Sequence, residues 1–149
     1  MSQVAALLLM FLNTDEDAFW GLHQLMVNEK YNMHAFFIPA FPKLQRFQDI
    51  HDKVICYLLM HHSFYDLLFH KVLLKKLKKV QKHLLSNGMD TGIYSIKWFL
   101  QCFLDRIPFS LSLRVWDIFL LEGDQVILAM AFNILKLHQK NILKLDMEQ

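Results

Sequence analysis

Residues 107–123 read IPFSLSLRVWDIFLLEG. Pro108 suits the first turn of a helix, and Gly123 suits the position just past its end, where glycine is favoured. Between them the apolar residues recur at helical spacing, which predicts a helix with one buried face. The residues predicted for that face are Val115, Trp116, Ile118 and Phe119.

The charged residues in the same stretch are most simply interpreted as having a structural role in the fold. Arg114 and Asp117 lie three apart on one helix, so they can pair with each other or with neighbouring side chains. Glu122 and Gly123 mark the helix end. Direct contact of Arg114, Trp116 and Asp117 with a partner protein is the alternative.

Helix is favoured along the whole chain. The 149 residues include only four glycines and three prolines, so few positions break a helix. No stretch alternates between apolar and polar residues over a useful length, so we predict an all-α fold with no sheet. The helices are predicted over 1–12, 15–28, 43–85 (as one helix or two), 94–103, 108–121 and 125–139.

Several of these helices carry signals for their ends or their buried side. Residues 1–12 are too apolar to face water, so we predict a buried helix. Thr14 with Asp17 resembles a capping arrangement; Pro42 suits a first turn, and Gly88 suits a C-cap. The helix after Thr14 is expected to bury Phe19, Leu22 and Met26, with Trp20 as a further candidate.

Composition narrows the class of protein. Hydrophobic residues make up 54% of the chain, above the 45–50% that is typical of soluble domains. Such an excess predicts either a mostly buried piece of something larger or a large partner interface. A net charge of +2 gives no reason to expect nucleic-acid binding. Cys56 and Cys102 are too few for a disulfide framework or a zinc site, so we expect small buried hydrophobes.

Localisation is predicted from what the sequence lacks. The apolar opening run has no basic segment before it, so it does not resemble a secretory signal. No uncharged run reaches the roughly 18 residues that a membrane-spanning helix needs. We expect a cytoplasmic protein.

The stretch at 107–123 resembles the signature segment of TBC domains, which has an apolar lead-in, Arg-x-Trp-Asp and an apolar run ending in Glu-Gly. The preceding WFLQCFL at 98–104 resembles the helix before that signature, and DAFW at 17–20, FFIP at 36–39 and FPKL at 41–44 resemble the family's middle section. The sequence of these segments is similar to that of the RN-tre branch of the family. The resemblance implies the C-terminal helical lobe of a Rab GTPase-activating domain, with a Rab-family GTPase as partner in vesicle trafficking.

That family resemblance also implies a mechanism with two catalytic groups. An arginine in Ile-x-x-Asp-x-x-Arg stabilises charge on the phosphates of GTP, and a glutamine in Tyr-x-Gln orients the attacking water. Neither motif occurs here. The residues three before Arg46, Arg106 and Arg114 are Lys43, Phe103 and Leu111, and no tyrosine is followed two positions later by glutamine. We expect a chain that begins just downstream of the glutamine, has no catalytic residue or cofactor, and is inactive alone as a GTPase activator.

A second departure from the family pattern lies at 55–72, which reads as added sequence. Lys53-Val54 and Lys71-Val72 bracket it with the same dipeptide, and removing one copy restores a family-like helix. We therefore predict one partial TBC domain over 1–149 with an insertion at about 55–72.

A lysine-rich stretch precedes residue 85. With apolar residues at helical spacing, it is expected to be an ordinary amphipathic helix packing its leucines inward. The alternative is a face for anionic membranes or a protein partner, which would allow peripheral contact with endomembranes. Its lysines are Lys71, Lys75, Lys76, Lys78, Lys79 and Lys82.

The eight histidines raise the question of a metal site. His62, Asp66 and His70 recur every four residues, with His61 alongside, which would place three ligands on one helix face. No cysteine completes a tetrahedral set, so we predict no metal. His51, between two aspartates, is expected to be a solvated surface group.

Beside the activator fragment, three readings stay open. The chain is a non-catalytic helical module that binds a Rab or another partner, a membrane-associating fragment, or a truncated product that folds poorly.

Overall fold

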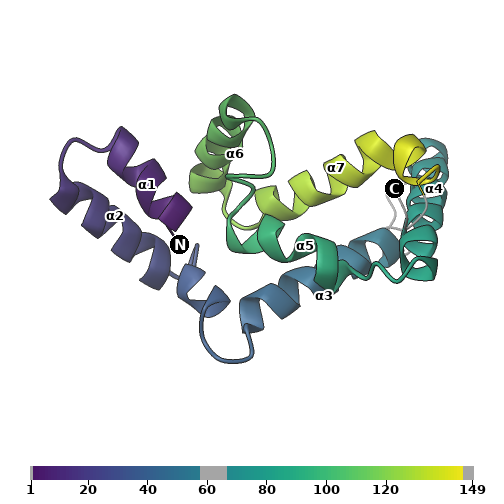
Figure 1. Cartoon of the computed structure of the whole chain (residues 1–149), viewed down its shortest axis with the longest axis horizontal. Helices are drawn as coiled ribbons and strands as arrows, with labels where there is room; N and C mark the ends of the chain where they lie inside the picture. Colours follow the sequence, from purple (N-terminus) through teal and green to yellow (C-terminus); the bar gives the residue numbers. More distant parts are fainter. Residues whose placement is uncertain (1, 58–66, 146–149) are drawn as a thin grey trace. The chain divides into compact units, whose positions relative to one another are not determined.

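The computed structural model describes residues 2–57 and 67–145, with side chains described for 2–52 and 77–145. Within these ranges the chain is helical and contains no strand, which confirms the all-α prediction. The elements are α1 (Ser2–Phe11), α2 (Asp15–Val27), the 3-10 helix η1 (Met33–Phe36), α3 (Pro42–Tyr57), α4 (Leu67–Ser86), α5 (Thr91–Leu100), α6 (Phe109–Glu122) and α7 (Gln125–Ile142) (Figure 1).

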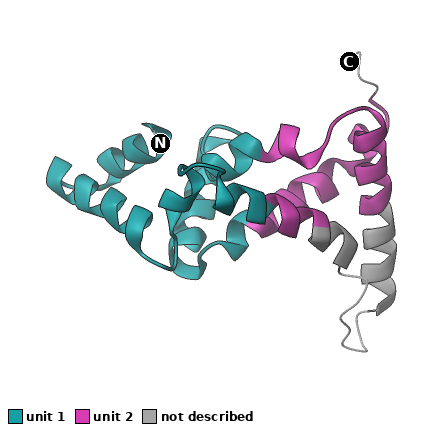
Figure 2. Ribbon diagram, turned by 90° about the horizontal axis from the view of Figure 1, so that it is seen from below, with its two compact units in different colours: residues 1–47, 96–127 teal, residues 48–95, 128–149 magenta. Residues whose placement is uncertain are grey.

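The chain divides into two compact units (Figure 2). Unit 1 comprises residues 1–47 and 96–127, and unit 2 comprises residues 48–95 and 128–149. Each unit therefore draws on segments that are far apart in the sequence, and the division falls within α3, α5 and α7.

Local sequence signals set the helix ends as predicted. Thr14 is the N-cap of α2: its hydroxyl accepts the N–H of Asp17 at 3.0 Å and donates to the Asp17 carboxylate at 2.8 Å. Pro42 is the first residue of α3. Past the end of α4, Gly88 has φ +72° and the N–H of Met89 reaches back to the carbonyl of Leu84 at 2.9 Å, as in a Schellman motif.

Some element bounds differ from the prediction. The stretch predicted as one helix or two over 43–85 forms α3 and α4, and residues 58–66 between them lie outside the described part. Half of the predicted insertion at 55–72, residues 58–66, therefore lies outside the described part, and side chains are not described for the other half. Helix α5 begins and ends three residues earlier than predicted, α7 continues to Ile142, and η1 was not predicted.

Aromatic rings form much of the core of unit 1. The Phe47 ring lies edge-on to Phe36 and Phe99, with centroids 5.2 and 5.3 Å apart. The centroid of the Phe119 ring lies 5.4 Å from that of Trp116 and 5.5 Å from that of Tyr31. All of these pairs except the tilted Tyr31–Phe119 pair are edge-to-face, and such pairs stabilise a fold by about 0.5–1.5 kcal/mol each beyond simple burial.

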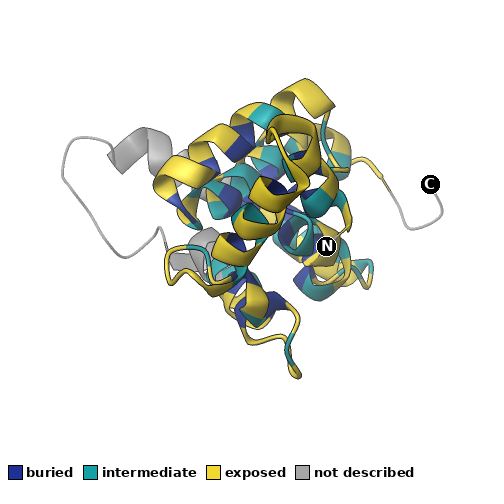
Figure 3. Cartoon of the chain, turned by 90° about the vertical axis from the view of Figure 1, so that its left-hand side faces the viewer, coloured by how far each residue is buried: buried dark blue, intermediate teal, exposed yellow. Residues whose placement is uncertain are grey.

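Helix α1 is not the buried helix that its composition predicts. It packs against α2 and buries Val4 and Leu7. Its last turn is open, however: Leu9, Met10 and Phe11 are 54%, 64% and 59% exposed. Figure 3 shows exposed positions beside buried ones along the helices. The prediction failed because the apolar residues surround this helix, and α2 covers only one side of it.

Helix α2 buries a different face from the predicted one. Ala18 and Leu25 are buried, while Leu22 and Met26 are half-buried. Phe19 and Trp20 are 61% and 53% exposed, so the prediction that Phe19 is buried was wrong. Ala18, Leu22 and Leu25 recur at helical spacing, which directs the two neighbouring aromatic rings away from the packed side.

Unit 2 contains a buried polar network. His51 is 1% exposed, and its Nε2 lies 3.2 Å from the Tyr94 hydroxyl. The Thr91 hydroxyl donates to the Asp52 carboxylate at 2.5 Å, and Gln81 of α4 donates to the same oxygen at 3.1 Å. Burial lowers the pKa of His51 to about 4, against the opposing charge of Asp52. The prediction of a solvated surface histidine was therefore wrong.

Candidate functional site

Helix α6, which carries the RVWD stretch, supports an unusual turn after α5. Cys102 and Phe103 both have positive φ, 45° and 64°, a conformation uncommon for residues other than glycine. The indole N–H of Trp116 donates to the Cys102 carbonyl at 3.1 Å, with Trp116 only 3% exposed. The buried Ser112 hydroxyl lies 3.4 Å from the Phe103 carbonyl. These contacts favour an architectural role for Trp116, which stays a prediction.

The other predicted residues of this stretch lie at the surface or at the helix end. Arg114 and Asp117 are exposed and form no ion pair with each other in the described part of the chain. Ile118, predicted for the buried face, is 49% exposed. Glu122 is exposed and accepts a hydrogen bond from Gln125 at 3.2 Å. Gly123, with φ +82°, ends the helix in a backbone conformation that favours glycine.

Side chains from the connection after α2 close the C-terminal end of α6. The ammonium of Lys30 donates to the carbonyls of Leu120 and Leu121, each at 2.9 Å. The Tyr31 hydroxyl donates to the Leu120 carbonyl at 2.7 Å. The last carbonyls of a helix have no partner within it, and a cation there is favoured by the helix dipole. These bonds fix the 28–31 segment against α6.

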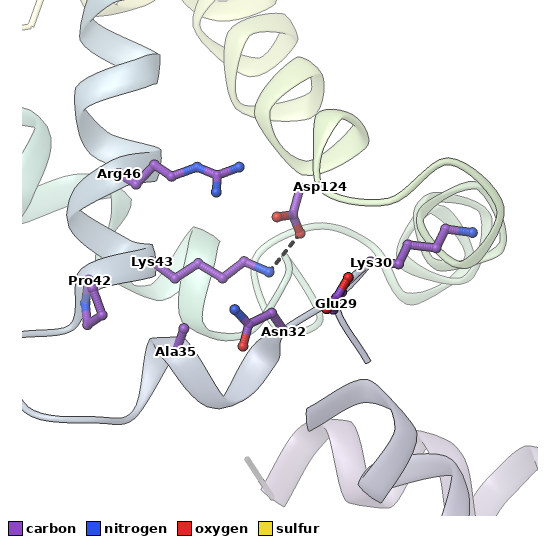
Figure 4. A pocket seen from close by; sticks show the side chains of 8 residues that line it. All are labelled: Glu29, Lys30, Asn32, Ala35, Pro42, Lys43, Arg46 and Asp124. Atoms are coloured by element: carbon purple, nitrogen blue, oxygen red, sulfur yellow. Dashed lines mark hydrogen bonds and ion pairs between the residues drawn. The ribbon is translucent and has the colours of Figure 1, made fainter. Parts of the chain in front are cut away.

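Beside this junction lies a polar cleft of about 480 Å³, within unit 1. Its walls come from the connection after α2, from η1, from the first turns of α3 and from the turn between α6 and α7 (Figure 4). It is lined by Glu29, Lys30, Asn32, Ala35, Pro42, Lys43, Arg46 and Asp124.

An ion pair between the buried Lys43 and the half-buried Asp124 forms one side of the polar cleft. Lys43 is 6% exposed, and its Nζ lies 2.8 Å from the Asp124 carboxylate and also donates to the Tyr31 carbonyl. The same ammonium lies 4.9 and 5.4 Å from the ring centroids of Phe36 and Phe47. A buried charge is costly unless it is paired. Lys43 thus joins α3, the connection after α2 and the α6–α7 turn.

Arg46 lies one turn further along α3 and is exposed. Residues three apart on a helix share a face, so Arg46 extends toward the cleft beside Lys43 (Figure 4). Across the described residues, Arg46 forms no ion pair or hydrogen bond with a side chain. Among the cations lining the cleft, it is the one for which the described part of the chain supplies no hydrogen-bonding or charged partner.

Sequence reasoning did not find the polar cleft. A signal was available: Lys43, Phe47 and His51 recur every four residues, and all three are buried. Polar residues on the apolar face of a helix indicate that each has a polar partner in the core. The helical pattern does not predict which residue that partner is. Asp124 lies 81 positions away from Lys43.

A second groove, apolar and about 290 Å³ in volume, lies between α1 and α6 in unit 1. It is lined by Leu7, Leu8, Phe11, Leu12, Leu113, Trp116, Asp117 and Leu120.

The lysine-rich helix is α4. Its apolar positions Leu77 and Val80 are buried, while Lys78, Lys79 and Lys82 are exposed. The side chains of Lys71, Lys75 and Lys76 lie outside the described residues. Because the apolar side is occupied, contact of the described part of this helix with a membrane would be electrostatic, and it stays a prediction.

The described residues give little support for a reactive cysteine, a metal site or a membrane-spanning helix. Burial raises the pKa of the Cys102 thiol to about 12, so the thiol is protonated and unreactive at neutral pH. No three histidine, cysteine or acidic side chains gather there as metal ligands would. His61, His62 and Asp66 lie outside the described residues, and the side chain of His70 is not described. No helix in the same ranges has the length and hydrophobicity to cross a bilayer.

Comparison with known proteins agrees with the resemblance of the signature stretch. The model of the Rab-GTPase-TBC domain family matches residues 1–143. The human protein TBC1 domain family member 2A is 28% identical over 146 residues, which cover 98% of this chain and 14% of that relative. This chain thus spans about a seventh of that relative's length. No solved structure matches significantly. The chain belongs to the Rab-GTPase-TBC domain family.

Proposed function

We propose that these 149 residues form a GTPase-binding segment of a Rab GTPase-activating domain, and that they do not accelerate GTP hydrolysis by themselves. One combined observation carries the proposal: the family model covers residues 1–143, yet the sequence contains neither Asp-x-x-Arg nor Tyr-x-Gln. The family role would be to stimulate GTP hydrolysis by a Rab in membrane trafficking. A cytoplasmic location, peripheral on endomembranes, and a place in the RN-tre branch complete the proposal.

The missing groups matter because hydrolysis depends on them. An arginine supplied in trans accelerates GTP hydrolysis by about 10³–10⁵-fold, and a glutamine orients the water. Of the three arginines here, Arg106 pairs with Asp105, with Nε 3.1 Å from the carboxylate. Arg46 and Arg114 are exposed, but no Tyr-x-Gln accompanies them. Binding without catalysis is the function that this set of residues supports.

Two features of unit 1 support a binding role. The polar cleft offers an unpaired cation, and the apolar groove adjoins the open last turn of α1, where Leu9, Met10 and Phe11 are exposed. Exposed apolar patches of this kind mark protein interfaces in soluble proteins.

Affinity measurements across a panel of Rab GTPases test the binding role. Circular dichroism first verifies that the purified chain is helical. Each Rab is then loaded with GDP or with a non-hydrolysable GTP analogue and titrated with the chain. We expect at least one Rab to bind more tightly in the GTP-analogue form. Absence of binding by every Rab, or equal affinity for both nucleotide forms, would overturn the proposal.

A further inference from the structure

The polar cleft has a specific electrostatic character. We propose that it binds a carboxylate side chain of the partner GTPase, with the guanidinium of Arg46 as the group that pairs with it. This inference rests on the proposed function, since it names the chemistry by which the partner would be recognised.

The charges that line the cleft leave Arg46 as the available cation. Lys43 and Asp124 neutralise each other at 2.8 Å. The ammonium of Lys30 is engaged with two carbonyls at the end of α6, and its side chain is directed away from Lys43 and Asp124 (Figure 4). Arg46 is therefore the lining cation whose side chain forms no ion pair or hydrogen bond in the described part of the chain.

The first turn of α3 adds to the positive potential. Helix α3 has 16 residues and begins at Pro42, which lines the cleft. The N-terminus of a helix carries about half a positive charge and leaves N–H groups without partners. The dipole of α3 therefore favours an anion near its first turns, which carry Arg46.

A carboxylate fits this setting better than a phosphate does. The planar guanidinium presents paired N–H donors that match the two oxygens of a carboxylate. A phosphate monoester carries about 1.5–2 negative charges at neutral pH, more than the one guanidinium of Arg46 can balance beside the carboxylates of Asp124 and Glu29. At about 480 Å³ the cleft has the size of a ligand site, so it can admit a side chain from another protein.

Charge reversal at Arg46 tests the inference with the full chain. The matched control is Lys97→Glu, because Lys97 is an exposed cation of α5 in the same unit and does not line the cleft. We expect Arg46→Glu to weaken the affinity for the best-binding GTP-form Rab about tenfold or more, and to reduce the dependence of binding on salt. Lys97→Glu should change the affinity less than twofold. Arg46→Lys should fall between wild type and Arg46→Glu, because lysine keeps the charge but loses the paired donors.

Thermal unfolding of Arg46→Glu should match that of wild type, since the side chain is exposed. An unchanged affinity in Arg46→Glu, or an equal loss in Lys97→Glu, would overturn the inference.

A second experiment tests the carboxylate site without a Rab. The Nε–Hε signal of Arg46 is followed by NMR while a hexaglutamate peptide is added, and separately while inorganic phosphate is added. We expect a saturable shift with hexaglutamate and a weaker response to phosphate. If no Rab binds wild type while hexaglutamate shifts Arg46, the proposed function fails but the carboxylate site stands. No shift with hexaglutamate, or tighter binding of phosphate, overturns the site itself.

Discussion

Trp116 shows how one side chain can hold a turn in an uncommon backbone conformation. Its indole N–H bonds the Cys102 carbonyl, where φ is 45°. We expect Trp116→Phe to lower the free energy of unfolding by about 1–3 kcal/mol, because a buried carbonyl would lose its donor. Urea unfolding measures the change.

The matched control is Trp20→Phe, because Trp20 is 53% exposed. It should change the free energy of unfolding by less than about 0.5 kcal/mol. Equal effects of the two substitutions would contradict the role assigned to the indole.

His51 gives the protein a predictable response to acid. Its pKa is about 4 in the folded chain and 6.5 when unperturbed, so the unfolded chain binds the proton first as pH falls. The stabilisation is fully present above about pH 6.5 and is lost as pH falls toward 4. The loss should reach about 3 kcal/mol, measured as the free energy of unfolding at a series of pH values.

Replacement of His51 should reduce the dependence of the free energy of unfolding on pH. His51→Gln is expected to flatten the slope between pH 6.5 and 4. His138→Gln, at an exposed position on α7, should leave the slope unchanged. A wild-type slope in His51→Gln would show that other groups cause the acid sensitivity.

The burial of polar side chains in the core could not be predicted from the sequence. Lys43 and His51 were not predicted to be buried, because charged and polar side chains are usually exposed. Their partners are distant in sequence: Asp124 for Lys43 and Tyr94 for His51. Such pairs follow from how helices meet, which no local pattern specifies.

Among the features of individual helices, their ends were the most predictable. Thr14, Pro42, Gly88 and Gly123 each mark an end as predicted, because capping depends on a few adjacent residues. The buried faces of α1 and α2 were not predictable in the same way. These helices are apolar on more than one side, so composition alone could not say which side packs.

Removing the cap of α2 should weaken it measurably. Thr14→Ala loses the oxygen that accepts the Asp17 N–H, and we expect the free energy of unfolding to fall by about 1 kcal/mol. Thr14→Ser keeps an acceptor and should stay within a few tenths of wild type. Thermal or urea unfolding of the two variants measures the difference, and equal loss in both would contradict the capping role.

For the whole molecule, the all-α class and the family were predictable because the signature stretch at 107–123 is long and specific. The high apolar content predicted an interface or a larger assembly, and the exposed apolar residues of α1 and α2 agree with either. The arrangement of the polar cleft was not predictable, because it joins four separate segments of the chain.

The predicted insertion can be tested by deletion. Removing residues 55–72 would join Val54 to Leu73 and restore a family-like sequence. We expect a larger soluble fraction on expression and a higher midpoint of thermal unfolding, because about ten apolar residues that the family pattern lacks would be gone. Unchanged solubility and midpoint would count against an insertion.

We propose that these residues bind a GTPase without supplying catalysis. The most direct measurement is single-turnover GTP hydrolysis by a panel of Rab GTPases with the folded chain in excess. We predict that every Rab hydrolyses GTP at its intrinsic rate, because neither catalytic motif occurs in the 149 residues. Clear acceleration of any Rab, lost on replacement of Arg46, Arg106 or Arg114, would contradict the claim and make that arginine a catalytic residue.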